Sequence, residues 1–215
     1  MLTGMSSQRS AEKSVLALTF DDGPSAWTVE ILDLLAEHGA RATFFVLGAN
    51  IAGCASTLRR AIAEGHQLGL HSWSHPHLPD LSPGEVRDEM FRTQTAIERA
   101  TGTVARFWRP PYFEANGHVR RALAGTELIE VGCTIAPEDY RWSALQTAAY
   151  VAERLEPGAI VDLHDGRPEN SGSDPTRTAT VAALEMILAE LEKRDLRSAP
   201  VSEFPLAALE KRSRS

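Results

Sequence analysis

Short apolar runs alternate with longer amphipathic stretches along this chain, and this alternation constrains the fold more than any other feature. Residues 15–18 and 42–47 are typical of buried strands, and residues 26–38 between them place apolar side chains on one helical face. Further strands are predicted at 67–70, 105–108, 128–133, 159–163 and 197–201, and further helices at 55–64, 82–100 and 178–194. Such an alternation predicts an α/β domain with a parallel sheet.

The size of the chain is sufficient for one self-contained core. It has 215 residues, of which 43% are hydrophobic, so folding requires neither disulfides nor a partner. We expect one domain over residues 14–206, with flexible termini at 1–13 and 207–215. Cys54 and Cys133 lack the CxxC spacing of a thiolate zinc site, and we expect both to be small core residues.

The charge and hydropathy of the chain exclude several classes of partner. A formal net charge of -7 argues against a nucleic-acid surface, and the basic residues 211–214 are typical of a solvated chain end. The chain contains no apolar run long enough to span a bilayer, and residues 1–13 lack the apolar core of a secretory signal. We therefore expect no nucleic acid, membrane or obligate protein partner, and a location either in the cytoplasm or outside the cell after removal of a leader.

Polar clusters follow the predicted strands closely. The sequences TFDDGP (19–24), HSWSH (71–75), RPPY (109–112) and LHD (163–165) each lie at the carboxyl end of an apolar run. In parallel α/β sheets and barrels this is the edge at which loops build active sites. The four clusters therefore predict one site.

The HSWSH cluster has the composition of a metal site. His71 and His75 are four residues apart and would share one face of a helical turn that Pro76 ends. Two imidazoles with one carboxylate leave coordination positions open for water and substrate, as a hydrolytic metal requires. Either Asp21 or Asp22 supplies the carboxylate. An isolated HxxxH is more often an exposed loop, but the neighbouring clusters weigh against that interpretation.

In this order, the four clusters resemble the motifs of the polysaccharide deacetylases, carbohydrate esterase family 4. The resemblance covers residues 15–204. It implies a distorted barrel of parallel strands with surrounding helices, and a divalent metal that is usually Zn²⁺. It also implies hydrolysis of an acetyl group, most often from the nitrogen of N-acetylglucosamine units.

The resemblance assigns roles to the residues of the first three motifs. It makes Asp21 the general base and Asp22, His71 and His75 the metal ligands, with Arg109 paired to Asp21. This division agrees with the chemistry, because a metal neutralises the carboxylate that binds it, whereas a neighbouring carboxylate remains able to accept a proton.

The remaining roles concern the acyl group and the leaving group. By resemblance, the backbone N–H of Tyr112 stabilises the oxyanion, its side chain contacts substrate, and His164 is the catalytic acid. The family has leucine two residues before this histidine, where this chain has Asp162. The apolar wall around the acetyl methyl is therefore altered, and Leu163 is the candidate to replace it.

The family's Asp-Trp motif matches residues 136–142 imperfectly. In one register Asp139 is the carboxylate that polarises the catalytic histidine, Tyr140 stands in the tryptophan position, and Trp142 adds an aromatic wall. In the other register Trp142 is in place and Arg141 stands where the acid belongs. The first register keeps the chemistry, and an ordinary charged turn is the remaining alternative.

These motifs predict a metal-dependent hydrolase that removes acetyl groups from carbohydrate containing N-acetylglucosamine, of the chitooligosaccharide or peptidoglycan type. An O-acetyl esterase acting on xylan, or an amide hydrolase acting on a small acetylated metabolite, would use the same residues. A non-catalytic protein that binds metal and sugar is a third interpretation. The polar residues 167–176 are predicted to form a flexible rim over the cleft.

Overall fold

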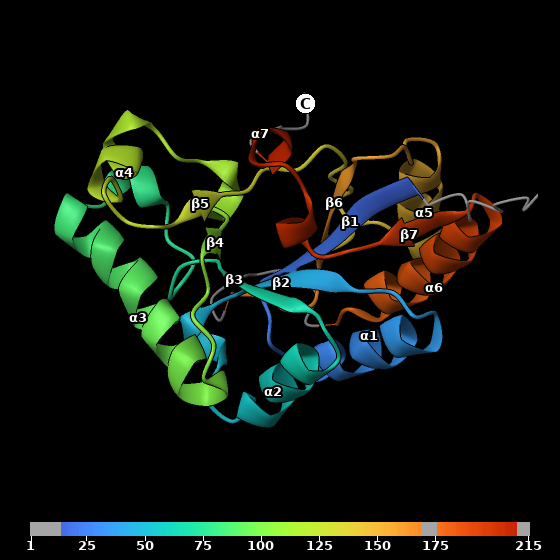
Figure 1. The fold of residues 1–215 in the computed structure, drawn as a ribbon, viewed down its shortest axis with the longest axis horizontal. Coiled ribbons are helices and arrows are strands. Elements are labelled where there is room, and N and C mark those ends of the chain that lie inside the picture. Colours follow the sequence, from blue (N-terminus) through green and yellow to red (C-terminus); the bar gives the residue numbers. More distant parts are fainter. Residues whose placement is uncertain (1–13, 169–175, 210–215) are drawn as a thin grey trace, which may run out of the picture.

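The computed structural model describes residues 14–168 and 176–209. Their strands form one parallel sheet in the order β5-β4-β3-β2-β1-β6, with β7 paired to β1 (Figure 1). The strands are β1 (Ser14–Asp21), β2 (Ala42–Val46), β3 (Gln67–Leu70), β4 (Phe107–Trp108), β5 (Ile129–Glu130), β6 (Ile160–His164) and β7 (Leu196–Ser198). The predicted parallel α/β sheet is confirmed.

The sheet curls toward a barrel. The first residues of β1 pair with β7 and the later ones with β6. On the other side, the segment after β5 crosses back to β6, because Val131 donates its N–H to Trp108 and Ile135 forms a parallel bridge with Val161. The expected distorted barrel of parallel strands is therefore confirmed as a curled half-barrel.

Most helices follow the strands as predicted. In Figure 1, α1 and α2 lie along the lower side of the sheet, with α3 at the left and α6 at the right. The helices are α1 (Ala26–Glu37), α2 (Ala55–Ala63), α3 (Pro83–Thr101), α4 (Gly117–Ala122), α5 (Ala144–Ala152), α6 (Thr178–Lys193) and α7 (Leu206–Leu209). Helix α3 begins at a capping box formed by Ser82 and Glu85, and it ends at Gly102, whose φ of 76° is left-handed. The sequence reasoning missed the helices α4, α5 and α7.

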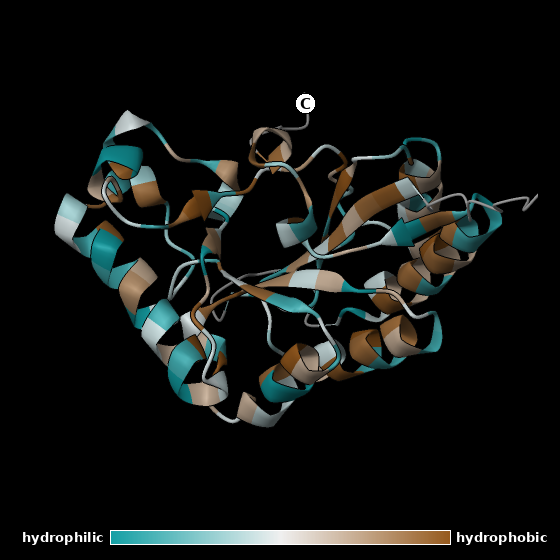
Figure 2. Ribbon diagram, viewed as in Figure 1, coloured by the Kyte–Doolittle hydropathy of each residue, from teal (hydrophilic) through white to brown (hydrophobic). Residues whose placement is uncertain are grey.

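Alternate residues of β1 serve two different layers. Leu16, Leu18 and Phe20 belong to the main core with the buried face of α1, whereas Ala17 belongs to a second, smaller apolar cluster on the opposite face. Figure 2 shows much of the apolar colour on β1, β6, α1 and α6. Asp21 shares the alternation of Ala17, so the strand carries its carboxylate on the face of the smaller cluster.

Three expectations about chain segments are corrected or limited. Residues 206–209 form α7, and Leu209 is fully buried. The carbonyl of Leu209 accepts the N–H of Gly132 at 2.7 Å. The prediction of a flexible C-terminal segment from residue 207 onward is therefore corrected for residues 207–209. Residues 1–13 and 210–215, and most of the predicted rim at 169–175, lie outside the described residues. Cys133 is buried as expected, whereas Cys54 is only half-buried. Among the described helices, none combines the length and apolarity that crossing a membrane requires.

Candidate active site and metal centre

The four polar clusters meet at the carboxyl edge of the sheet. Asp21 ends β1 and lies beside His164 in the register of β6. His71 follows β3, and its backbone N–H donates to Val46 at 2.9 Å, while Arg109 follows β4. Because neighbouring parallel strands end together, residues up to 143 positions apart in the sequence become neighbours. The single site predicted from the clusters is present.

Three side chains form a group able to hold a metal ion. One ligand atom each from Asp22, His71 and His75 lies within 4.8 Å of the others. The Nε2 atoms of His71 and His75 are 3.5 and 3.4 Å from Asp22 Oδ1. This oxygen is buried and accepts no hydrogen bond in the described part of the chain. A buried carboxylate oxygen facing two imidazole nitrogens fits a divalent cation.

The protonation of these imidazoles suits metal binding. His71 Nδ1 lies 2.8 Å from the carbonyl oxygen of Arg109, which can only accept, so Nδ1 carries the proton and the Nε2 lone pair faces Asp22. Burial lowers the pKa of both His71 and His75 to about 3, so both are neutral at physiological pH. The neutral imidazole is the form that binds metals.

The HSWSH segment is a loop, which corrects the predicted helical turn. Residues 71–77 have no helical assignment, and Ser72 and His75 adopt left-handed φ values of 71° and 61°. The two imidazoles converge because the loop folds back on itself. The spacing of four residues correctly indicated that the two imidazoles lie together. The cause is the fold of the loop and not a helical turn.

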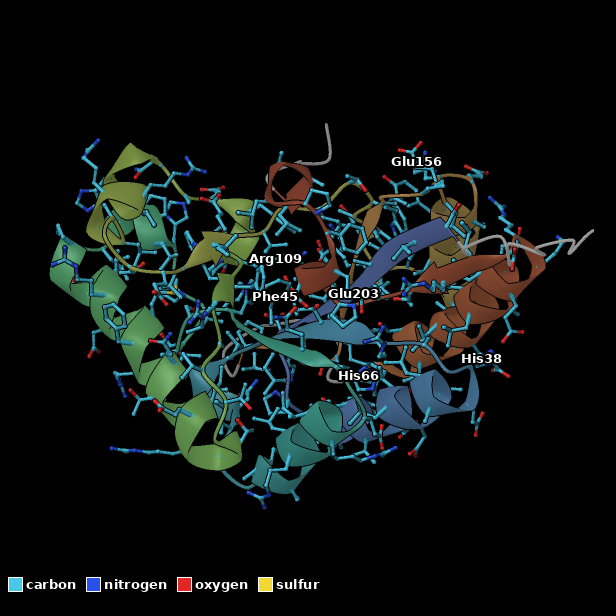
Figure 3. All side chains as sticks on the ribbon, in the orientation of Figure 1. His38, Phe45, His66, Arg109, Glu156 and Glu203 are labelled. Carbon is cyan, nitrogen blue, oxygen red and sulfur yellow. The ribbon has the colours of Figure 1, made fainter. Side chains whose placement is uncertain are left out.

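Arg109 lies at the base of the site and joins two carboxylates. Its guanidinium is fully buried, 4.3 Å from the ring of Phe45, and Figure 3 labels both residues near the middle of the molecule. Nη1 donates to Asp21 Oδ1 and to Asp162 Oδ1, both at 2.8 Å. The expected pairing of Arg109 with Asp21 is present, and Asp162 is an additional partner that sequence reasoning missed. The alternation of β6, which puts Asp162 on the face of His164, was the available signal.

The two carboxyl groups beside Arg109 are easier to protonate than free aspartates. Burial raises the pKa of Asp21 to about 6, although the charge of Arg109 opposes this effect. Burial also raises the pKa of Asp162 to about 7, and the neighbouring charge of Asp21 acts in the same direction. Two buried carboxyl groups that share one guanidinium repel each other when both are charged.

His164 is held by Asp139. Its Nδ1 lies 2.7 Å from Asp139 Oδ1, while Asp139 Oδ2 accepts the N–H of His164 at 2.9 Å and the hydroxyl of Thr180 at 2.7 Å. Burial alone lowers the pKa of His164, but the charge and hydrogen bond of Asp139, with the charge of Asp162, raise it to about 10. This contact favours the register that aligns Asp139 with the family's carboxylate, because the side chain of Arg141 is exposed and pairs with Glu138.

Two tyrosines flank the polar groups. The ring of Tyr140 packs edge-on against His164, with centroids 5.1 Å apart. The ring of Tyr112 lies 4.6 Å from that of His75, and 60% of its surface is exposed. Tyr140 thus packs against His164 and Tyr112 against His75, and their expected contacts with substrate stay a prediction.

Two other residues expected to contact substrate do not join these groups. Trp142 packs against Tyr150 of α5, with ring centroids 5.2 Å apart. Leu163 is fully buried in the main core, because its neighbours Asp162 and His164 occupy the opposite face of β6. Leu163 thus exposes no surface to substrate and cannot replace the missing apolar wall.

Close approach of two loops explains the glycine of the DDGP motif. A Cβ at Gly23 would lie 2.2 Å from the carboxylate of Asp165, and a Cβ at Gly166 would lie 2.1 Å from the carbonyl oxygen of Asp22. Asp165 is fully buried and accepts the hydroxyl of Thr28 at 2.6 Å. The turn after Asp22 is therefore packed directly onto the turn after His164, and this packing needs glycine on both sides.

Comparison with known proteins agrees with this geometry. The family description "Polysaccharide deacetylase" matches residues 8–129. A chitooligosaccharide deacetylase of Bradyrhizobium sp. (strain ANU 289) is 37% identical over 194 residues, which are 87% of this chain and 89% of that protein. A peptidoglycan-N-acetylglucosamine deacetylase of Listeria monocytogenes is 34% identical over 190 residues, which are 88% of this chain and 38% of that protein.

A solved structure gives the same result for the fold. The family 4 acetyl xylan esterase from Clostridium thermocellum, in complex with a cobalt ion, superposes with a TM-score of 0.80 at 30% identity. The match covers 94% of this chain and 98% of that one. By its sequence, its curled parallel sheet and its Asp-His-His group, the chain belongs to the polysaccharide deacetylase family, carbohydrate esterase family 4.

Proposed function

We propose that this chain is a metal-dependent hydrolase that removes acetyl groups from N-acetylglucosamine units of a chitooligosaccharide or peptidoglycan type of carbohydrate. One observation carries the proposal. The metal-binding group of Asp22, His71 and His75 lies beside a carboxylate, Asp21, and an imidazole, His164, that are not needed as ligands. A hydrolase that cleaves an amide needs such a base and such an acid in addition to its metal.

The proposed metal is Zn²⁺, held by Asp22, His71 and His75. Two imidazoles and one carboxylate are a donor set that zinc accepts in catalytic sites. When bound, the cation supplies a Lewis acid for the acyl oxygen and lowers the pKa of water.

Asp21 is the proposed general base. Arg109 holds one of its carboxylate oxygens at 2.8 Å, and Asp21 Oδ2 lies 3.6 Å from the Nε2 of His71. The carboxylate is therefore fixed beside the metal-binding group, where it accepts the proton of the attacking water. Its pKa of about 6 leaves it charged at neutral pH and basic enough to accept that proton.

His164 is the proposed general acid. With a pKa of about 10 its imidazole carries a proton at neutral pH, and Asp139 holds Nδ1 so that Nε2 is the atom left to donate. An amine leaves far more readily once it is protonated, so this donation lets the carbon–nitrogen bond break with its electron pair remaining on the nitrogen. We further propose that the backbone N–H of Tyr112 stabilises the oxyanion and that Tyr112 and Tyr140 contact the sugar.

An O-acetyl esterase is the second candidate function. The likeness to an acetyl xylan esterase favours it, and Asp162 stands where the family's apolar acetyl wall is expected. The base and metal group would be the same for an ester. Only the choice of substrate therefore distinguishes the two candidate functions, because their site residues are the same.

Acetate release by the purified protein tests the proposal. The protein is loaded with zinc and offered chitooligosaccharides, peptidoglycan fragments, acetylated xylan and an artificial acetyl ester, with a chelated sample as the control. We expect release from the N-acetyl sugars that stops on chelation. Release from esters alone would replace the proposal by the esterase function. Metal binding without activity on any substrate would favour an acetylated small metabolite or a binding role.

A further inference from the structure

The loop between His71 and His75 holds an unfavourable backbone conformation. Ser72 and His75 both have φ in the left-handed region, where residues other than glycine are uncommon. Such residues persist only when the surrounding contacts fix them. Because His75 ends the loop, the contacts that fix the loop also set the direction of its imidazole.

The carbonyl groups of the loop are held from the sheet side. The 3₁₀ helix η1 (Gly48–Asn50) follows β2, and its Gly48 N–H donates to the carbonyl of Ser72 at 3.1 Å. The Ala49 N–H donates to the carbonyl of Trp73 at 3.0 Å. These bonds satisfy the carbonyl groups of Ser72 and Trp73 and leave the N–H groups of Trp73 and Ser74 to be satisfied by another element.

A single carboxylate on α3 accepts the N–H groups of Trp73 and Ser74, whereas Ser72 Oγ accepts the N–H of His75 at 3.0 Å. Glu89 Oε2 accepts the backbone N–H groups of Trp73 and Ser74 at 2.7 and 2.8 Å, and Glu89 Oε1 accepts the hydroxyl of Ser74 at 3.0 Å. One turn further along α3, the guanidinium of Arg92 lies 4.3 Å from the ring of Trp73. Hydrogen bonds to a charged acceptor are the stronger kind, so Glu89 is the principal anchor of the loop tip.

We propose that Glu89 is a positioning residue of the metal site, which fixes the loop so that His75 Nε2 faces Asp22 Oδ1. These two atoms are 3.4 Å apart. The inference rests on the proposed metal-dependent function. His71 does not depend on Glu89 in this way, because its ring is held by the carbonyl of Arg109. Glu89 therefore acts on one ligand of the three.

The chemistry of the anchor predicts a graded response. Glu89→Ala removes the acceptor of the Trp73 and Ser74 N–H groups. Ser72 Oγ still accepts the N–H of His75 at 3.0 Å, so the loop tip loses its anchor and His75 Nε2 is held less firmly toward Asp22. Glu89→Gln keeps one oxygen of the same shape and loses the charge. Removing a group that orients a metal ligand typically weakens metal affinity about 10- to 100-fold, so we expect this range for alanine and a smaller loss for glutamine.

Metal affinity of the two variants tests the proposal. The zinc dissociation constant is measured by competition with a chromophoric chelator, and the visible spectrum of the Co²⁺ form reports coordination geometry independently of activity. Glu98→Gln is the matched control, because it removes the same charge from an exposed position of α3. We expect Glu89→Ala to raise the zinc dissociation constant about 10- to 100-fold over this control and to change the Co²⁺ spectrum.

The outcomes separate this inference from the function on which it rests. If the wild-type protein binds neither zinc nor cobalt, the proposed function fails and the inference fails with it. If the wild-type protein binds metal and Glu89→Ala matches the control in affinity and spectrum, only the inference is overturned. Should the alanine variant not fold, equal zinc affinity in Glu89→Gln and in the control overturns the inference in the same way.

Discussion

Replacing Asp139 by asparagine is expected to remove the proton from Nδ1 of His164 without moving the imidazole. Asp139 Oδ2 accepts two hydrogen bonds, from the N–H of His164 and from Thr180, so the amide oxygen of an asparagine is needed at that position. The amide NH₂ then faces His164 Nδ1, which has to accept instead of donate. The imidazole becomes neutral, with its proton on Nε2.

The size of the effect on catalysis follows from the rise in the pKa of His164 that Asp139 causes. A change in the pKa of His164 from its ordinary 6.5 to about 10 represents about 5 kcal/mol of preference for the charged form. Without the charge of Asp139, burial dominates and we expect this pKa to fall to roughly 7 or below. General acids contribute about 10²- to 10⁴-fold to rates, so kcat for an N-acetyl substrate at pH 8 should fall by at least about 100-fold.

NMR titration of His164 in the metal-free protein measures the pKa, and the pH dependence of kcat measures its consequence. Glu138→Gln is the control. Glu138 is the neighbour of Asp139 in the sequence, and its side chain pairs with Arg141, so the substitution removes the same charge without touching His164 directly. An unchanged pKa of His164 in Asp139→Asn would refute the reasoning. A kcat within threefold of wild type at pH 8 would refute the role of His164 as acid.

The same shift has a consequence for stability. The folded protein has the higher pKa, so His164 stabilises the metal-free fold fully below pH 6.5, and this contribution is lost as the pH rises toward about 10. The free energy of unfolding of Asp139→Asn should therefore change less between pH 6.5 and 10 than that of the wild-type protein. Chemical denaturation at several pH values in this window checks the difference, and parallel curves for the two proteins would contradict it.

Three other substitutions test separate parts of the structure. Asp21→Asn should keep zinc, as measured by metal analysis, while kcat falls by about 100-fold or more, and wild-type turnover would contradict its role as base. His71→Ala should lose metal and activity together, so unchanged metal content would show that the ligand set is wrong. His66 accepts the N–H of Ala42 at 3.1 Å, and burial lowers its pKa to about 4. His66→Asn keeps an acceptor, so relative to wild type it should gain up to about 3 kcal/mol of stability between pH 7 and pH 4, and urea unfolding that shows no such gain would contradict this.

Local sequence patterns were sufficient to predict the elements and the meeting of the motifs. The apolar run at 42–47 and the capped stretch at 82–100 form β2 and α3 within one residue at each end. TFDDGP and LHD could be assigned to one site because parallel strands end at a common edge, whatever the strand order is. Each of these inferences depends only on neighbours in the sequence or on a general rule of α/β sheets.

The tertiary structure decided the contacts between residues far apart in the chain. The sequence left two registers for the residue beside His164, with either Asp139 or Arg141 in place. The packing of β6 against the segment before α5 puts Asp139 there, and Arg141 pairs with Glu138 instead. Likewise, Asp162 pairs with Arg109 although the two residues are 53 positions apart in the sequence.

The HSWSH loop shows the physical reason for this limit. Its two histidines indicate a metal from the sequence alone, but its backbone was predicted to be helical, because local propensity does not include a carboxylate brought from α3. The sequence by itself determined which groups are available for the chemistry. The folded chain determined which carboxylate pairs with Arg109, with His164 and with the N–H groups of the loop. Burial makes these long-range partners necessary, because buried charges and N–H groups require a partner within the protein.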